Sequence, residues 1–382
     1  MKLVYVLGGN YDASGMCSVI TKKINWFAEH TDWEITALLT ESPNGRDFYF
    51  PLHDSVKIAN FHLNYDELDT MGKVKKFFHY RQKQKLYKKM FKNFLMDYRP
   101  DIVVSAMRRE INFLPGINDG SRKVGELHFC RHTYRVFTHS KLPGFICKGI
   151  TRYWQSQLLR QIQKLDAFVV LTEEDRKAWG DLPNMCVIPN FIQSIPEVPS
   201  SGAQKVVVAV GRYTEQKGFD LLFKAWQKVE ECEKDWQLKI FGSGDRAAYQ
   251  RLVEKMGLKN VTLNGTVKDV NDAFREGSIM VFSSRYEGFG MVLIEAMACG
   301  LPTVSFACPC GPRDIIQEGE DGFLVEDFDT DKLADRLLEL MHNDTLRKDM
   351  GKRARQNMQR FMQEDVMLLW KRLLEEQMVK GR

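Results

Sequence analysis

Residues 283–302 read SSRYEGFGMVLIEAMACGLP, and this stretch decides the fold class. An apolar, strand-like run precedes it, Gly288 and Gly290 form a turn, and the apolar segment 291–298 predicts a short helix that a Gly-Leu-Pro sequence ends. A buried strand, a glycine turn and a helix make half of a βαβ unit. The stretch therefore indicates a parallel sheet of the α/β class.

The same pattern repeats on both sides of this stretch. Short apolar runs that alternate with helical patterns occur at 3–7, 34–39, 101–106, 167–172, 206–210, 237–241, 279–283 and 302–305. Between 189 and 202 the chain is rich in Pro, Ser and Gly, which is typical of a linker. We therefore expect two doubly wound, Rossmann-like domains of ordinary size.

The end of the chain is almost wholly helical by pattern. Residues spaced for one apolar face are Phe361, Met362, Val366, Leu369, Trp370 and Leu373. We expect a first domain at 1–198, a second domain at 199–360, and a final helix at 361–382 that returns to the first domain.

Composition fits a folded protein with an uneven charge. The 382 residues are 44% hydrophobic, which excludes intrinsic disorder. The net charge is +5, but 1–199 hold 28 basic and 21 acidic residues, whereas 200–382 hold 27 and 29. Such asymmetry between halves indicates different partners for each half.

Neither the cysteines nor the apolar runs indicate secretion or membrane insertion. The eight cysteines are scattered without CxxC or zinc spacing, which predicts a reducing, cytoplasmic compartment. The N-terminal apolar run 3–7 is too short for a signal peptide, and no run reaches the ~18 residues of a spanning helix. We expect a protein that is soluble or lies on the inner face of the membrane.

Two carboxylates flank the glycine turn. Glu287 lies in the loop and Glu295 about one turn into the predicted helix, whose N-terminus offers free N–H groups to an anion. Carboxylates on both sides of an anion site suit a ligand with hydroxyls at both ends and phosphate between them, such as a nucleotide sugar. Alternatively, Glu295 is an ordinary surface residue of its helix.

Two further loops follow strand-like runs in the same half. Gly211-Arg212 and, five residues later, Lys217-Gly218 place a guanidinium and an ammonium where a diphosphate could bind. Gly242 and Gly244 could flank a nucleobase. Each loop alone is equally consistent with a solvated turn, but ligands bind at the carboxyl ends of parallel strands, where all three motifs would meet.

These motifs together resemble the retaining glycosyltransferases of family four, which have the GT-B fold of two Rossmann-like domains facing a cleft. Additional matches are the helix–Gly-Leu-Pro-Thr-Val turn at 291–304, Gly-Pro-Arg-Asp-Ile-Ile at 311–316, where Asp314 replaces the usual Glu, and Asp-Gly-Phe-Leu-Val at 321–325. The resemblance is specific over 205–330 and architectural over 1–200.

The resemblance implies roles for these residues. Arg212 and Lys217 would bind the donor diphosphate, Glu287 the transferred sugar, and Glu295 the ribose. Other donor-binding positions implied are Gly211, Gly242, Gly244, Gly288, Phe289, Gly290 and Met291. It also implies catalysis without a metal or a cofactor, in which the leaving diphosphate helps to remove the acceptor proton.

On the acceptor side the resemblance implies a glycine-rich first loop and a histidine facing the cleft. Gly9 and Gly15 fit the loop. His128 is our choice for the histidine, His132 is the rival, and His139 is a weaker candidate; a histidine held only by its own domain is the alternative.

The implied activity is transfer of a hexose, with retention, from a nucleotide diphosphate sugar (we expect UDP) to a glycan or lipid-linked acceptor. Such transfer would serve cell-surface polysaccharide synthesis, of lipopolysaccharide or capsule. Two alternatives stay open: a nucleotide-sugar epimerase of the same fold, and a non-catalytic protein that binds sugar nucleotides or a membrane surface.

The excess positive charge gathers at 73–99, which holds ten Lys or Arg and one acid, Asp97. Aromatic residues recur there at three- and four-residue steps: Phe77, Tyr80, Tyr87, Phe91, Phe94 and Tyr98. This predicts a basic amphipathic helix with its aromatic side chains inward. It could bind an anionic membrane surface or simply present a solvated charged face. We expect no nucleic acid partner, because no nucleic-acid-binding motif accompanies the charge.

Overall fold

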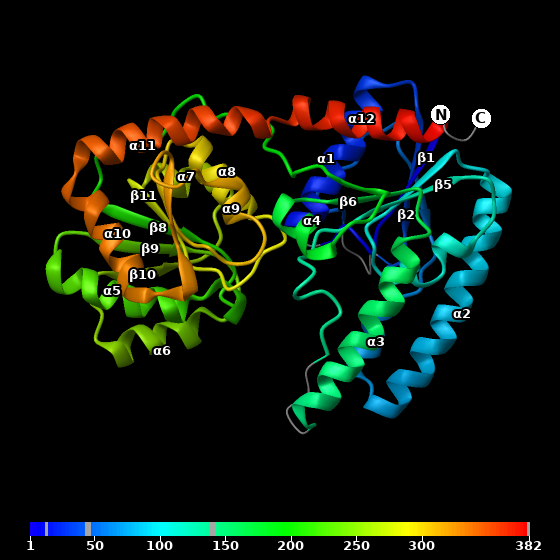
Figure 1. The fold of residues 1–382 in the computed structure, drawn as a ribbon, viewed down its shortest axis with the longest axis horizontal. Helices are drawn as coiled ribbons and strands as arrows, with labels where there is room; N and C mark the ends of the chain where they lie inside the picture. The colour runs from blue at the N-terminus through cyan, green and yellow to red at the C-terminus, as the bar shows by residue number, and fades with distance from the viewer. Residues whose placement is uncertain (12–13, 43–46, 138–141, 380–382) are drawn as a thin grey trace.

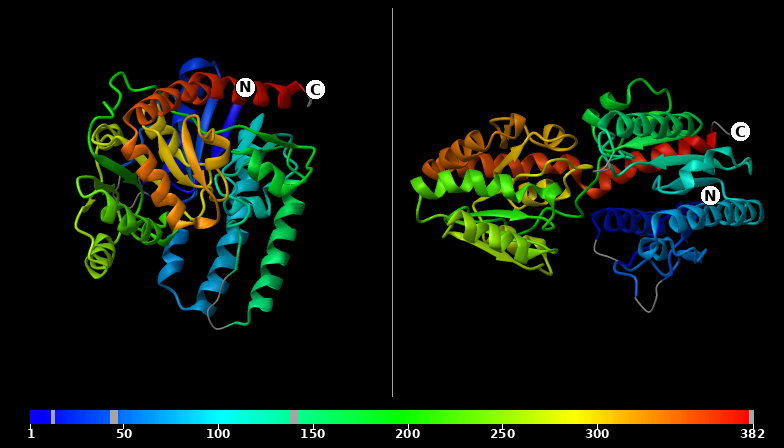
Figure 2. Two further views of the ribbon diagram at one scale, coloured as in Figure 1. Left: turned by 60° about the vertical axis from the view of Figure 1, so that its left-hand side comes forward. Right: turned by 90° about the horizontal axis from the view of Figure 1, so that it is seen from below.

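The protein consists of two α/β lobes that lie side by side. The computed structural model describes residues 1–11, 14–42, 47–137 and 142–379. Each lobe is built on its own sheet, and the last helix lies along the first lobe (Figure 1). Figure 2 shows the same separation from two further sides. The predicted GT-B architecture of two Rossmann-like domains is confirmed.

The first sheet has seven parallel strands in the order β3-β2-β1-β4-β5-β6-β7. They are β1 (Lys2–Val6), β2 (Glu34–Leu39), β3 (Lys57–Asn60), β4 (Ile102–Ser105), β5 (Arg122–Glu126), β6 (Ala167–Val170) and β7 (Met185–Val187). The helices of this lobe are α1 (Gly15–His30), α2 (Lys73–Tyr98), α3 (Gly144–Ile162) and α4 (Glu173–Trp179). The central strands are hydrophobic along their length because helices cover both faces of a parallel sheet.

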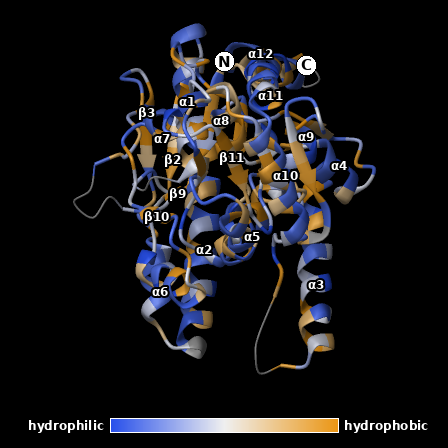
Figure 3. Cartoon of the chain, turned by 90° about the vertical axis from the view of Figure 1, so that its left-hand side faces the viewer, coloured by the Kyte–Doolittle hydropathy of each residue, from blue (hydrophilic) through white to orange (hydrophobic). Residues whose placement is uncertain are grey.

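The second sheet has six parallel strands in the order β10-β9-β8-β11-β12-β13. They are β8 (Val206–Val210), β9 (Gln237–Phe241), β10 (Val261–Asn264), β11 (Ile279–Phe282), β12 (Thr303–Phe306) and β13 (Gly322–Val325). Its helices are α5 (Phe219–Cys232), α6 (Arg246–Met256), α7 (Val270–Arg275), α8 (Met291–Ala298), α9 (Pro312–Ile315), α10 (Thr330–His342) and α11 (Asp344–Asn357). In Figure 3 strand β11 is strongly hydrophobic, whereas α6 alternates hydrophilic and hydrophobic residues along its length.

All eight strand segments expected from the sequence are strands, and the structure has further strands that the sequence pattern did not predict. The missed strands include β3, β7, β10 and β13, which all lie at or next to a sheet edge. Each is only three or four residues long. An edge strand is covered less completely, so its hydrophobic pattern is weaker.

The chain crosses twice between the lobes, and the two crossings are hydrogen-bonded to each other. The Ile192 N–H donates to the Phe361 carbonyl at 2.9 Å, and the Gln363 N–H donates to the Ile192 carbonyl at 2.9 Å. Arg355 adds a bond from Nη2 to the Pro196 carbonyl at 2.6 Å. The predicted linker therefore lies against the start of the last helix, while the exact boundaries at 198 and 360 stay predictions.

Helix α12 (Gln363–Val379) returns to the first lobe, as expected. The residues that it buries in the core of that lobe are Val366, Met367, Trp370 and Leu374. The Trp26 indole also donates to Glu364 Oε2 at 3.0 Å. Leu369 was expected on the apolar face, but its side chain is 44% exposed. Positions 366, 370 and 374 follow the four-residue step of the buried face, and 369 falls beside it.

The predicted basic helix is present as α2, but not all of the aromatic side chains expected on its inner face are buried. Tyr87 and Phe91 are buried under the first sheet, whereas Phe77 is 55% exposed. The first turns of α2 extend beyond the sheet of the first lobe, as those of α3 also do (Figure 1), so Phe77 has no core to enter. Among the described residues, no helix combines the length and hydrophobicity needed to cross a bilayer.

Candidate active site

The three sequence motifs of the second lobe meet at one place. They follow β8, β9 and β11, which are neighbours at the centre of the sheet. Because the strands are parallel, their carboxyl ends form one edge, and the loops 211–218, 242–245 and 283–290 lie there together. The structure therefore brings together the residues that the sequence analysis assigned to the donor.

Glycines allow these loops to pack against one another. A Cβ on Gly242 would lie 2.7 Å from the Gly211 carbonyl carbon, and one on Gly218, which has φ +63°, would lie 3.1 Å from that of Ser283. Neither backbone can move away cheaply, so both positions require glycine. Arg285 adds a two-pronged bond to Asp220 at 2.7 and 2.8 Å. The loops are thus fixed before any ligand binds.

A groove borders the second loop. It has a volume of about 920 Å³ and is lined by the loop after β9, the first half of α6, the end of β10 and the loop after β10, including Gly242, Gly244, Asp245 and Thr266. Gly244 has φ +111°, so a side chain there would be strained. The position predicted to border a nucleobase does therefore border an open groove.

Lys217 and Glu287 form an ion pair at the centre of the site. Lys217 Nζ lies 2.8 Å from Glu287 Oε1, and both side chains are largely buried. The Glu287 N–H donates to the Pro309 carbonyl at 3.1 Å, which fixes the loop that carries it. Arg212 is exposed at the mouth of the site, and within the described ranges no acidic side chain pairs with it. One cation is thus held by a carboxylate and the other is available to an anion.

Glu295 is an isolated carboxylate on α8. Its helix begins after Gly290, which has φ +99°, and the first N–H groups of α8 have no partner within the helix. Burial raises the pKa of Glu295 to about 7, although Lys22 and Lys217 oppose the rise and Asp269 adds to it. No described side chain bonds to the Glu295 carboxylate, and the residue is partly exposed, so its assignment to the ribose stays a prediction. Lys22 on α1 approaches from the other lobe.

His128 lies directly against the donor loop, but its ring is turned inward. A Cβ on Gly288 would lie 3.0 Å from the His128 carbonyl carbon, so the two lobes touch here. The ring Nε2 bonds to Glu126, a buried carboxylate that also pairs with Lys23 and contacts the Tyr5 hydroxyl. The ring orientation that was predicted to face the cleft is therefore set by Glu126.

Electrostatics keep this buried group ionised. Burial alone would raise the pKa of Glu126, but Lys23 and His128 together lower it to about 2. Burial raises the pKa of Tyr5, so its hydroxyl stays protonated. Lys23 also lies 4.2 Å from the Trp370 ring centroid, which connects the cluster to helix α12. The sequence contained one sign of this cluster, the Lys22-Lys23 pair on a helix.

The remaining acceptor-side residues occupy the predicted first loop. Gly9 follows β1, and its carbonyl accepts a bond from Cys17 Sγ at 3.3 Å. Gly15 is the first residue of α1, capped by Ser14, and open space surrounds it. His132 is exposed beyond the site, and His139 lies outside the described residues.

A second contact between the lobes was missed by the sequence analysis. Asp314 caps helix α4, accepting from the Glu173 N–H at 2.7 Å and the Glu174 N–H at 3.3 Å. Glu174 in turn bonds to the Cys310 N–H at 2.8 Å and to Arg313 at 3.0 Å. Nothing in the spacing of residues 140 positions apart indicated this pairing, because it arises only from docking of the lobes.

Possible metal ligands were also compared with the site. Cys130, Asp175 and Cys310 form the one group of three possible ligands within the described residues, and it lies outside the donor loops. Asp329 and Asp331 have the Asp-x-Asp spacing of a possible metal-binding pair. Asp329 instead caps helix α10, because its carboxylate accepts from the Asp331 N–H at 3.0 Å.

Comparison with known proteins finds a family model that matches the second lobe. Residues 191–357 match the model of glycosyl transferases group 1. The chain is 26% identical over 291 residues to a poly(ribitol-phosphate) alpha-N-acetylglucosaminyltransferase of Staphylococcus aureus, covering 74% of this chain and 59% of that one. It is 33% identical over 220 residues to an amylovoran biosynthesis glycosyltransferase of Erwinia amylovora, covering 54% and 61%. The matched part thus spans about three fifths of the length of these relatives.

The fold is also that of solved glycosyltransferases. A structure of S. aureus TarM in complex with fondaparinux, alpha-GlcNAc-glycerol and UDP superimposes with a TM-score of 0.75. The match covers 98% of this chain and 99% of that one, at 16% identity.

Proposed function

We propose that the protein transfers a hexose from a nucleotide diphosphate sugar, with UDP as the nucleotide, because residues 191–357 match the model of glycosyl transferases group 1. We propose retention of the anomeric configuration and a glycan or lipid-linked acceptor in cell-surface polysaccharide synthesis. The names of the two curated relatives and the UDP in the TarM complex support this choice.

One observation carries the proposal. Glu287, paired with Lys217, precedes the N-terminus of α8, and Glu295 lies on the helix itself, close enough for the Lys217 charge to act on its pKa. In the proposed complex the diphosphate lies at this N-terminus, Glu287 accepts bonds from the sugar hydroxyls and Glu295 from the ribose hydroxyls. In that complex the ion pair between Lys217 and Glu287 weakens, and the Lys217 ammonium bonds to the phosphate.

The proposed chemistry needs no nucleophile from the protein. The acceptor hydroxyl oxygen attacks the anomeric carbon from the face that the diphosphate leaves, the bond from that carbon to the phosphate oxygen breaks, and the acceptor proton passes to that oxygen. Arg212 and Lys217 stabilise the charge that develops on the diphosphate, the largest contribution in such sites. We propose that these cations do so without a metal or another cofactor.

A donor screen tests the proposal. Nucleotide sugars are compared by thermal shift, since a ligand at 100 times its Kd stabilises by roughly 2.7 kcal/mol. The stabilising donor is then used in a transfer assay with Arg212→Ala/Lys217→Ala. We expect this double variant to lose nearly all transfer. The control Lys224→Ala, which changes an exposed lysine of α5, should keep wild-type transfer. Wild-type turnover by the double variant would overturn the assignment.

The same screen separates the two alternatives. An epimerase would convert the donor to its epimer without an acceptor, and a non-catalytic protein would be stabilised by the donor without hydrolysis or transfer. Either result would replace the proposed transfer.

We further propose that α2 and α3 bring the enzyme to an anionic membrane surface on the cytoplasmic side. The basic residues exposed along α2 include Arg81, Lys85, Lys88, Lys89 and Lys92. Between Glu126 and Asp166 the chain has no acidic residue. Both helices expose large apolar side chains: Phe77 and Phe78 near the start of α2, and Phe145, Ile146 and Tyr153 along the first half of α3.

Vesicle binding tests this partner. Neutralising Lys85, Lys88 and Lys92 to Gln removes about 1 kcal/mol each, so partitioning into phosphatidylglycerol vesicles should fall on the order of 100-fold. The matched control neutralises Lys255, Lys259 and Lys268, which are exposed on the other lobe. Equal binding of both triple variants, or wild-type binding that salt leaves unchanged, would contradict the proposal.

A further inference from the structure

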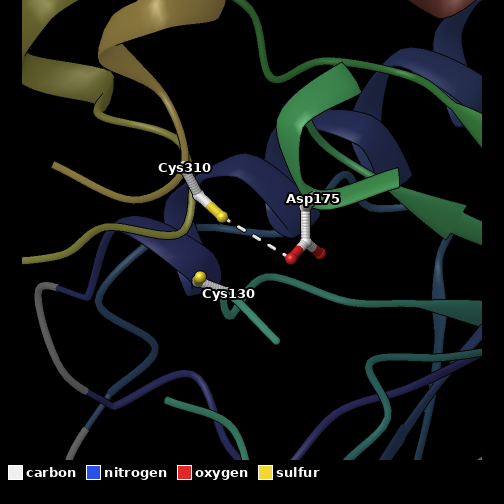
Figure 4. Close-up of side chains that lie close together, drawn as sticks. All are labelled: Cys130, Asp175 and Cys310. Carbon is white, nitrogen blue, oxygen red and sulfur yellow. Dashed lines mark hydrogen bonds between the residues drawn. The ribbon is translucent and has the colours of Figure 1, made fainter. Parts of the chain in front are cut away.

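Three buried side chains from both lobes gather outside the donor loops. They are Cys130, in the loop after β5; Asp175, on α4; and Cys310, in the loop before α9 (Figure 4). One sulfur or oxygen atom of each lies within 4.8 Å of those of the other two. We call these three residues the interdomain thiol cluster.

The carboxylate of this cluster is held in a fixed orientation. Asp175 Oδ1 accepts from the Arg131 N–H at 2.8 Å, and Oδ2 accepts from the Trp179 indole at 3.0 Å. In Figure 4 the Cys310 sulfur points at this carboxylate, and the S···O distance is 3.5 Å. Donors that orient a ligating side chain in this way are a regular part of metal sites.

The spacing fits a tetrahedral ion. With a Zn–S bond of about 2.3 Å and a Zn–O bond of about 2.1 Å, a tetrahedral angle separates sulfur from oxygen by about 3.6 Å. The observed separation of 3.5 Å agrees with this value. Two sulfur ligands favour a borderline or soft ion over magnesium or calcium, which prefer oxygen.

The backbone at Cys310 supports a special role for its side chain. Cys310 has φ +65°, a left-handed conformation that a non-glycine residue rarely adopts. The Glu174 carboxylate, from the other lobe, accepts a hydrogen bond from the Cys310 N–H. Strained residues of this kind concentrate at ligand sites.

We propose that Cys130, Asp175 and Cys310 bind one zinc-like divalent ion that joins the two lobes. Binding releases the two thiol protons to solvent, and the two thiolates and the carboxylate supply three ligands. The fourth position is taken by water or by His132, an exposed side chain two residues after Cys130. A thiol pair alone would suit a disulfide, but a disulfide has no use for the oriented carboxylate.

The ion would set the width of the cleft. Cys130 follows His128 by two residues, and Pro309, next to Cys310, accepts the bond from the Glu287 N–H. A bond between the two loops would therefore fix the His128 backbone relative to the loop of Glu287. The site is independent of the proposed transfer, so a failure of either proposal leaves the other standing.

The test measures metal in the purified chain. The protein is purified without chelators, reconstituted with zinc, and analysed for zinc by mass spectrometry. We expect about one ion per chain in the wild type, and less than a tenth in Cys130→Ser and Cys310→Ser. Two controls should keep the ion: Cys308→Ser, a buried cysteine of the same loop, and Cys232→Ser, an exposed one. His132→Ala separates water from histidine as the fourth ligand by its zinc affinity.

Cobalt supplies a second readout that does not depend on activity. The wild type with Co²⁺ should show thiolate-to-cobalt charge-transfer absorption, and its melting temperature should rise; neither should occur in Cys310→Ser. The proposal is wrong if reconstituted wild type holds no zinc, or if Cys310→Ser holds as much as wild type. A loss of two hydrogen masses that reductant reverses would show a disulfide instead and would also overturn it.

Discussion

Replacing Gly288 by Ala tests whether the lobes meet in the working enzyme as they do in the structure. The added methyl group would lie 3.0 Å from the His128 carbonyl carbon, and the carbonyl oxygen would be nearer still. Carbon atoms pack at about 3.5 to 4.0 Å, so the two backbones must separate by about 1 Å. Gly288 has no positive φ, so the substitution adds no strain within its own loop.

A shift of this size predicts a large loss of rate with little loss of binding. Misplacing reacting groups by about 1 Å can lower the rate on the order of 100-fold, which corresponds to about 2.7 kcal/mol. The donor loops contact one another within the second lobe, so the nucleotide Kd should change by less than about threefold. The assay is steady-state transfer with the donor found by thermal shift, together with nucleotide titration.

The matched control is Gly116→Ala in the first lobe, where nothing lies within 4 Å of the added methyl group. It should retain wild-type kcat/KM and stability. Transfer by Gly288→Ala within threefold of wild type would refute the reasoning, because it would mean that the lobes do not touch at His128 during catalysis.

Two further predictions concern buried charges. Burial raises the pKa of Glu295 to about 7 from an ordinary 4.5, so its ionisation opposes folding as pH rises from 4.5 to 7. Glu295→Gln should therefore become more stable than wild type as pH rises from 5 to 8, by at most about 3 kcal/mol in the free energy of urea unfolding. It should also bind nucleotide about tenfold more weakly at pH 8. If the unfolding free energies of the two proteins changed with pH in parallel, the stability prediction would be wrong. Lys23→Met leaves the buried Glu126 with one cationic partner fewer, and should lower the free energy of unfolding by about 3 to 5 kcal/mol at pH 7. Because the folded pKa of Glu126 is about 2, the stability it contributes is present above about pH 4.5 and is lost as pH falls towards 2. Adding Glu126→Gln to Lys23→Met should restore much of the lost free energy of unfolding. A double variant that is no more stable than Lys23→Met alone would count against the ion pair.

Much of the fold followed from local patterns. Strands β1, β8 and β11 were predictable because they are central and hydrophobic throughout, and the Pro-rich linker marked the crossing. Leu369 and Phe77 were expected to be buried but are exposed. A helical period indicates which face of a helix is apolar, but not how far the neighbouring core extends along that face. The short edge strands had too little covered surface to leave a signal.

The donor loops were predictable for a topological reason. Parallel strands bring their carboxyl ends to one edge, so motifs 70 residues apart, such as those of Lys217 and Glu287, must meet. The inward ring of His128 was not predictable, because Glu126 takes it as a partner only together with Lys23 from another helix.

The sequence by itself determined the two parallel sheets and the glycine turns, since each depends on patterns within one supersecondary unit. Only the tertiary structure decided what lies between the lobes: His128 against Gly288, Asp314 on α4, and the interdomain thiol cluster. These contacts join segments more than 100 residues apart through docking of two surfaces, and no local periodicity records which surface residues will face each other.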